Sequence, residues 1–163
     1  MRYEAIAMVL VAIIGTSTNS FAREREWHVG GSAGAELDPA HEVAPLLGLQ
    51  AGYGVLDAVD ARAEVFGAYR PKHPHVDLGA LLGLNLKFDV TRWVPFVGVA
   101  VGAQSALDAS ELAALIVPAV GVDYLVSRDW SWGLEYRPAL LLSAAPLELE
   151  HQCLLRLEKR WGW

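Results

Sequence analysis

The final part of this chain, from Trp130 to Trp161, alternates between apolar and polar residues in two stretches. The first stretch, 130–141, has its apolar residues at even positions, and the second, 147–161, has them at odd positions. Because side chains of a β-strand point to opposite faces with a period of two, each stretch predicts a strand with one apolar and one charged face. Long alternating strands that end in an aromatic residue are typical of transmembrane β-barrels.

The composition suits a membrane protein without a membrane-spanning helix. The 163 residues are one domain's worth of chain, and 53% of them are hydrophobic, more than in an average soluble protein. The longest apolar runs, 93–107 and 112–122, are shorter than the roughly 18 to 20 residues of a spanning helix, and both contain glycine and proline. They are long enough for tilted strands.

The N-terminus has the pattern of a secretory signal peptide over residues 1–22. Arg2 precedes an unbroken apolar stretch, and the small residues Ser20 and Ala22 occupy the positions that a signal peptidase reads. We expect cleavage after Ala22 and an exported domain over 23–163. The alternative is an N-terminal membrane anchor, for which the apolar stretch is too short. No cysteine comes directly after the stretch, so lipoprotein processing has no acceptor.

The charge and the cysteine content narrow the choice of partners. The formal net charge is −6, and it stays the same after cleavage because Arg2 and Glu4 cancel. An acidic chain is a poor nucleic-acid binder on bulk electrostatics. Cys153 is the single cysteine and cannot form an intrachain disulfide. We expect no cofactor, and a fold held together by its hydrogen-bond ladder and its packing.

The exported part divides into eight strand-like segments without any linker. They cover residues 27–37, 46–55, 61–69, 76–88, 93–103, 113–125, 130–141 and 147–161. The turns after the even segments are tight, and the connections after the odd segments (38–45, 70–75, 104–112 and 142–146) are longer. This asymmetry matches a barrel with short periplasmic turns, longer outer loops and both termini in the periplasm. We therefore predict an all-β fold, an eight-stranded antiparallel up-and-down transmembrane β-barrel.

Alternation alone does not say which face points inward. A soluble ligand-carrying barrel would turn its apolar face inward, whereas a membrane barrel would turn it outward. Two features favour the membrane barrel. The alternate positions that make up the polar face of each strand, called here the polar parity, contain many glycines. Glycines suit the crowded interior of a narrow barrel. Strands of about ten residues tilted by about 45° also span about 23 Å, close to the apolar band of about 25 Å of an outer membrane.

The polar parity also carries charges of both signs, which can pair across the interior. We predict a charge network inside the barrel made of Arg62, Glu64, Asp77, Lys87, Asp123, Glu135 and Arg137, with Glu150, Arg156 and Glu158 on the same parity. Within it, Glu135 is expected to accept hydrogen bonds from one or both of Arg62 and Arg137. Such a network is more often structural than a conducting path, because buried charges are costly unless they are paired.

Aromatic residues gather near the predicted strand ends, where amphipathic rings favour a membrane interface. The predicted interface aromatics are Trp27, Trp93, Trp130, Tyr136 and Trp161, and Tyr53, Tyr69 and Phe88 follow the same trend. The alternative is that these rings are core aromatics of a β-sandwich. A sandwich seldom places so many tryptophans beside charged turns.

Three stretches carry a resemblance to a known family. They are Trp93-Val-Pro-Phe-Val-Gly-Val-Ala-Val-Gly102, then Val120-Gly-Val-Asp-Tyr124 with Trp130-Ser-Trp-Gly-Leu-Glu-Tyr-Arg137, and the terminal Leu155-Arg-Leu-Glu-Lys-Arg-Trp161. The chain resembles the small eight-stranded outer-membrane β-barrel proteins of the OmpA, OmpX and OmpW kind. The resemblance implies a bacterial outer-membrane location and a C-terminal aromatic that the barrel-assembly machinery reads. Trp161 or Trp163 would take that part, and the extra 162–163 departs from the family pattern.

Eight strands enclose an interior just wide enough to be filled by side chains, so a general diffusion porin is not expected. The loops are short, which disfavours a receptor with a large outer surface. We therefore expect a non-enzymatic, monomeric structural or interaction protein with a plugged polar lumen, whose partners are outer-membrane lipid and the assembly machinery. Its role would be in envelope integrity or at the cell surface.

Four alternatives stay open at this point. A lipid-modifying deacylase or acyltransferase needs a serine, a histidine and a carboxylate, and Ser143, His151 and Glu150 are candidates, although strand parity puts the last two on opposite faces. A metal could be held by His41, Glu42, His73 and His75 in two outer loops. The other two are a narrow pore for small solutes and a soluble periplasmic carrier.

Overall fold

The computed structural model describes residues 26–39, 41–72, 74–88, 91–107, 112–142 and 147–161. The predicted signal peptide, 1–22, lies outside the described residues. Within these ranges no helix is long and apolar enough to cross a membrane.

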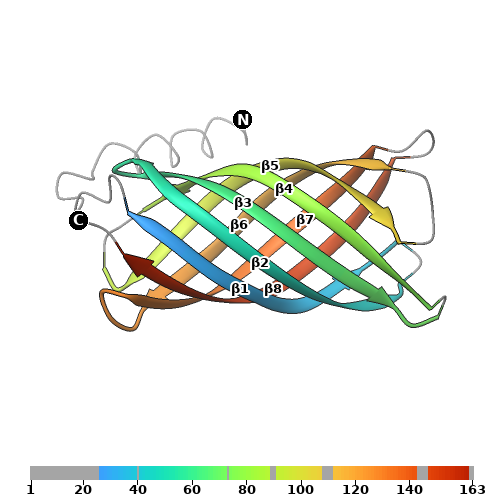
Figure 1. The fold of residues 1–163 in the computed structure, drawn as a ribbon, viewed down its shortest axis with the longest axis horizontal. Coiled ribbons are helices and arrows are strands. Elements are labelled where there is room, and N and C mark those ends of the chain that lie inside the picture. The colour runs from blue at the N-terminus through green and yellow to red at the C-terminus, as the bar shows by residue number, and fades with distance from the viewer. Residues whose placement is uncertain are drawn as a thin grey trace, which may run out of the picture.

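The described residues form eight β-strands (Figure 1). They are β1 (Trp27–Leu37), β2 (Val43–Leu56), β3 (Val59–Arg70), β4 (His75–Lys87), β5 (Trp93–Ala106), β6 (Ala113–Leu125), β7 (Trp130–Leu142) and β8 (Glu148–Trp161). Each strand pairs antiparallel with the next, and β1 pairs with β8, so the sheet closes into a barrel. The prediction of an all-β, eight-stranded antiparallel up-and-down barrel is confirmed.

The two ends of the barrel differ in what they carry. At one end β1 begins and β8 ends, with Trp27 paired opposite Trp161; this terminal end is at the left of Figure 1. The opposite end is named here the loop end. The terminal-end connections are 57–58, 88–92 and 126–129, and those of the loop end are 38–42, 71–74, 107–112 and 143–147. The connections of the two ends differ less in length than the sequence predicts.

The difference arises because several strands run further toward the loop end than predicted. β2 begins at Val43 and includes Pro45, whose predicted place was in a loop. Pro45 pairs with Ala35 of β1, while the pairing of β2 with β3 begins only at Leu46. A proline is tolerated at such a position because the ladder on its other side has not yet begun. Similarly, β3 extends to Arg70.

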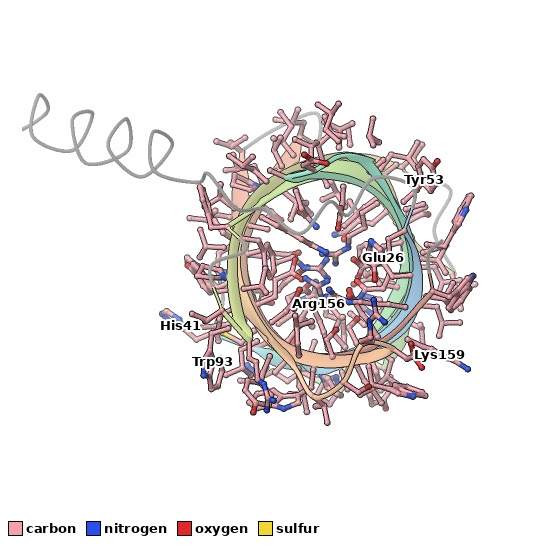
Figure 2. The ribbon with its side chains drawn as sticks, turned by 90° about the vertical axis from the view of Figure 1, so that its left-hand side faces the viewer. Glu26, His41, Tyr53, Trp93, Arg156 and Lys159 are labelled. Atoms are coloured by element: carbon pink, nitrogen blue, oxygen red, sulfur yellow. The ribbon has the colours of Figure 1, made fainter. Side chains whose placement is uncertain are left out.

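Side chains alternate between the two faces of the barrel wall. Figure 2 looks along the barrel and shows Arg156 inside the ring and Trp93 and Lys159 outside it. The outward face is apolar and exposed; Leu47, Leu49 and Leu82 are each 67% exposed or more. In water such a continuous apolar wall would be unfavourable, so the wall requires an apolar surrounding.

Candidate functional site

The barrel interior is the candidate functional site, because charged side chains from all parts of the sheet meet there. The seven residues of the predicted charge network all point inward, and none is more than 9% exposed. These seven residues do not form a single network, and their partners include other residues. Together with Glu150, Arg156 and Glu158, which the sequence placed on the same parity, and with residues that the sequence did not single out, they form three clusters. They are named here the central, terminal and loop-end clusters.

The central cluster joins β3, β7 and β8. Arg62 donates from Nη1 to both oxygens of Glu135, at 2.9 and 3.0 Å, and from Nη2 to Glu64. Arg137 donates to both oxygens of Glu64, at 2.7 and 3.0 Å. Glu135 also accepts from Nη1 of Arg156 at 3.0 Å. The expected bond from Arg62 to Glu135 is present, whereas Arg137 binds Glu64 and Arg156 takes its place at Glu135. Each carboxylate thus has two guanidinium partners, which offsets its loss of water.

Glu158 of β8 extends the central cluster toward the terminal end. It accepts hydrogen bonds from Arg156 and from Nε2 of Gln50, the latter at 2.8 Å. Nη2 of Arg160 lies 3.3 Å from Oε2 of Glu158. Three arginines, Arg62, Arg137 and Arg156, therefore face the three carboxylates of Glu64, Glu135 and Glu158, and the central cluster is balanced in charge.

The terminal cluster contains His28, Asp60, Lys87, Asp123 and Arg160. Lys87 forms an ion pair with Asp60, and Nε2 of His28 lies 3.3 Å from Oδ2 of Asp60. Nη2 of Arg160 lies 3.4 Å from Oδ2 of Asp123. The predicted residues Lys87 and Asp123 are thus paired, but with Asp60 and Arg160. Asp60 looks like a turn residue in the sequence, and it is inward because β3 begins before it, at Val59.

The loop-end cluster is built around Arg70. This guanidinium contacts four carboxylates: Glu36 at 2.6 Å, Glu150 at 2.7 Å, Asp77 at 2.8 Å and Asp38 at 3.5 Å. Nε2 of Gln152 also donates to Glu36, at 2.7 Å. One arginine facing four carboxylates leaves this mouth of the barrel with an excess of negative charge, unlike the central cluster.

Arg70 is a residue of the candidate site that sequence reasoning missed, because 70–75 was predicted as a loop. A signal for it exists in the sequence. Arg70 continues the inward parity of Arg62 and Glu64 along β3, and its burial at 8% exposure follows from that parity. The carboxylate of Glu36 was also missed, although it lies inside β1, which was predicted with its correct bounds.

Part of the interior is apolar, which the prediction of a polar lumen does not cover. A buried hydrophobic cluster contains Ala44, Leu46, Phe66, Ala68, Leu81, Leu115, Val117, Ala139, Leu141 and Leu154. The guanidinium of Arg137 lies 6.0 Å from the ring centroid of Phe66, and that of Arg156 lies 4.8 Å from that of Phe96. Aromatic rings at this range add cation–π attraction to the ion pairs. The lumen is therefore filled by packed apolar side chains as well as by charges.

Glycines on the inward face make room for the charged side chains. A Cβ at Gly48 would lie 2.9 Å from Oε1 of Glu64, and one at Gly52 would meet the ring of His28. Contacts this close would push the neighbouring polar groups out of place. The polar-parity glycines are thus positions where the crowded interior leaves no space for a side chain.

A small cavity lies beside the central cluster. Its volume is about 20 Å³, and its lining includes Arg62, Glu135, Arg137 and Asn85. Nδ2 of Asn85 and Nε of Arg137 have no hydrogen-bond partner in the protein. Since a water needs roughly 10 to 15 Å³ and several polar partners, the cavity has room for about one water molecule. It is far too small for a solute.

Four of the five predicted interface aromatics lie at the terminal end. Trp27 and Trp161 are paired across β1 and β8, Trp93 begins β5 and Trp130 begins β7. All four are exposed on the outward face. Ring centroids of Trp27 and Tyr53 are 4.7 Å apart, and those of Trp93 and Tyr124 are also 4.7 Å apart. The terminal end thus carries aromatic side chains on its outward face, some of which contact one another in pairs.

Tyr136 does not fit the assignment as an interface aromatic at a strand end. It is the middle residue of β7, faces outward, and its hydroxyl lies 2.7 Å from Nδ1 of His151 on β8. A phenol on an apolar wall needs a hydrogen-bond partner, and His151 supplies one away from the ends of the strand.

The residues of the enzymatic alternative do not come together. Glu150 points inward and contacts Arg70, whereas His151 points outward and contacts Tyr136. The carboxylate therefore does not orient the histidine, as a nucleophilic triad requires. Ser143 lies outside the described residues.

Two described residues of the metal alternative, Glu42 and His75, have other partners. Glu42 is buried, and its Oε1 accepts the backbone N–H of Lys72 at 2.7 Å. Nε2 of His75 lies 3.4 Å from Asp77, and His73 lies outside the described residues. Among the residues that the structure describes, no group of three or more His, Cys, Asp or Glu is arranged to hold a metal ion.

Comparisons with known proteins give a match in fold but not in sequence. No protein-family model matches the chain, and no curated protein matches it. The N-terminal β-barrel domain of OprF from Pseudomonas aeruginosa superposes with a TM-score of 0.65 at 13% identity, over 82% of this chain and 97% of that one.

Two further solved structures give the same result. Neisserial surface protein A matches with a TM-score of 0.64 at 13% identity, over 85% of this chain and 96% of its own. The outer membrane protein OprG from Pseudomonas aeruginosa matches with a TM-score of 0.59 at 12% identity, over 86% and 98%. At such identities the likeness concerns the fold alone. The chain has the fold of the small eight-stranded outer-membrane β-barrel proteins, as the sequence predicts.

Proposed function

We propose that this protein is a structural or interaction β-barrel of the bacterial outer membrane, with a plugged lumen and a role in envelope integrity or at the cell surface. The observation that carries the proposal is the filled interior, enclosed by an apolar wall. Three ionic clusters and a hydrophobic cluster occupy the lumen. An eight-stranded barrel has just enough interior volume for such side chains.

The outer-membrane location rests on the outward face and on the fold. Large apolar side chains such as Leu49, Leu82 and Val101 project from the wall, and aromatic side chains gather at the terminal end. This is the arrangement that outer-membrane barrels use, with an apolar band bordered by aromatic residues. The structural neighbours are themselves outer-membrane barrels.

The proposed role is non-enzymatic and involves few partners. The charges of the central and terminal clusters are paired with one another, and Glu150 and His151 face away from each other. Short loops leave little outer surface for a large ligand. The proposed partners are outer-membrane lipid and the barrel-assembly machinery, with Trp161 at the end of β8 as the aromatic that this machinery reads. Trp163, the other candidate, lies outside the described residues. We propose a monomer that does not bind nucleic acid.

A gel experiment tests the membrane placement. The chain is expressed with its N-terminal segment, extracted from outer-membrane fractions in detergent, and run on a gel with and without heating. A folded membrane barrel should migrate as a compact, fast form without heating and as a slower form after boiling. A monomer that is recovered in the soluble fraction without detergent would overturn the proposal and favour the periplasmic carrier.

A further inference from the structure

A groove runs along the outer wall of the barrel over β7, β8 and β1. It has a volume of about 590 Å³ and is bordered by Trp130 and Trp132 on β7 and by Leu155 and Leu157 on β8. Its floor on β1 includes Gly31. The groove lies in the terminal half of the wall, because Trp130 begins β7 and Trp132 follows two residues later.

The depression follows from side-chain size. Outward positions of β1 in the groove include Gly31 and Ala33, which pair with Leu157 and Leu155 of β8. Large rings project from β7, on the other side of β8. A Cβ at Gly31 would have only an ordinary contact, 3.6 Å from the carbonyl oxygen of Gly48. The absence of a side chain there is therefore not imposed by the barrel's own packing, unlike at Gly48 or Gly52. An apolar trough of this kind fits a hydrocarbon chain.

A single charge lies at the groove. Lys159 of β8 is exposed, points outward (Figure 2) and lines the groove. It is the only Asp, Glu, Lys or Arg on the outward parity of the eight described strands. Its Nζ lies 5.9 Å from the ring centroid of Trp130, and no described carboxylate forms an ion pair with it. A cation on an apolar wall is costly in lipid unless it reaches a polar partner.

We propose that this groove binds one phospholipid with an anionic headgroup, its acyl chain lying along Gly31 and Ala33 and its phosphate on the ammonium of Lys159. The proposal rests on the outer-membrane placement above, in which the terminal end faces the periplasm. The phosphate satisfies the charge of Lys159 at the level of Trp130, where an indole ring also favours the headgroup region.

A second copy of this chain is a less suitable occupant of the groove. The outward parity of the described strands carries no carboxylate, so the wall of another barrel offers Lys159 no counter-charge. Two copies that meet through this same face would bring two lysines together in an apolar contact. An anionic lipid has both parts that the groove requires, an apolar chain and a negative phosphate.

Native mass spectrometry of the folded, detergent-purified barrel tests the proposal. Phosphatidylglycerol and phosphatidylcholine with the same acyl chains are titrated separately, and the affinity for the first bound lipid is compared. The wild type should prefer phosphatidylglycerol. Lys159→Gln should weaken phosphatidylglycerol binding by about fivefold, leave phosphatidylcholine binding nearly unchanged and so remove the preference. Lys159→Arg should keep the preference.

A variant that fills the groove provides a second test of the lipid site. Gly31→Leu should weaken binding of both lipids, since the new side chain occupies the path of the acyl chain. The matched control is Ala80→Leu, an exposed outward position on β4 away from the groove, which should bind like the wild type. The heat-modifiable migration of every variant reports that the barrel is folded.

Three results would overturn the lipid site. They are equal affinity of the wild type for the two lipids, unchanged phosphatidylglycerol binding in Lys159→Gln, and a protein dimer that Gly31→Leu disrupts. Each can occur while the protein still behaves as a heat-modifiable membrane barrel. Loss of that behaviour in the wild type would instead contradict the proposed function.

Discussion

At the scale of single residues, Glu135 shows why the interior must be treated as one packed unit. It is 3% exposed and accepts hydrogen bonds from Arg62 and Arg156. Removing it would leave two buried guanidinium groups with one fewer carboxylate. We expect Glu135→Ala to lower the free energy of unfolding by about 3 to 5 kcal/mol, measured by urea titration of the barrel folded in lipid vesicles.

The control for this variant has to be an acidic residue without buried partners. Glu42 in the first loop is unsuitable, because it is buried and accepts the N–H of Lys72. Glu148 begins β8 and is exposed, so Glu148→Ala should change stability by less than about 1 kcal/mol. Equal effects of the two substitutions would mean that the central cluster contributes little to the folded barrel.

Val99 tests which face of the wall meets lipid. It lies near the middle of β5, points outward and is 51% exposed. Val99→Arg should destabilise the barrel in vesicles by about 2 to 4 kcal/mol, the cost of a cation near the middle of a bilayer.

The matched control places the same charge in a terminal-end turn. Asp57 is exposed between β2 and β3, so Asp57→Arg should have a small effect. Thr91 is less suitable because its hydroxyl accepts the N–H of Trp93 at 3.1 Å. If Val99→Arg were as mild as Asp57→Arg, the outward face would not be in lipid.

At the scale of strands, β8 decides whether the barrel closes in one register. Its pairing with β1 sets Leu155 opposite Ala33 and Trp161 opposite Trp27. A shift by one residue would turn every side chain of β8 to the opposite face and bring Arg156 and Glu158 onto the apolar wall. The buried ion pairs therefore stabilise one register over its neighbours.

Cys153, the single cysteine, reports this register directly. It is exposed on the outward face of β8, so a nitroxide attached to it should be relaxed efficiently by oxygen and poorly by a water-soluble nickel chelate. Electron paramagnetic resonance of the labelled barrel in vesicles measures both rates. The reverse order would indicate a slipped β8 or an outward face in water.

For the strands, the sequence predicts the faces well and the ends less well. The alternation and the turns between the segments predicted the number of strands and the two faces of each strand. The glycines and the charges of both signs on the polar face then predicted the burial of Arg62, Glu64, Glu135 and Arg137. The strand ends were less accurate, since the ends depend on cross-strand pairing. Arg70 was therefore missed: its four carboxylate partners come from β1, β4, β8 and the first loop.

At the scale of the whole molecule, the barrel combines an apolar wall with a filled lumen. The lumen changes along the barrel from balanced ion pairs in the central cluster to an excess of carboxylates around Arg70 at the loop end. The pairing partners across the barrel could not be predicted from parity, because several arginines and several carboxylates share the inward face. They follow from the closed geometry, which sets β3 opposite β7.

Single-channel recording of the folded protein in planar bilayers tests the filled lumen most directly. The folded state of the protein is first verified by the heat-modifiable migration of a sample from the same preparation. Because the central cluster and the apolar cluster occupy the interior, the inserted wild type is predicted to give no conductance steps in salt solution. Regular steps from the wild type, enlarged in Glu135→Ala without loss of stability, would contradict the account and replace the plugged barrel with a narrow pore.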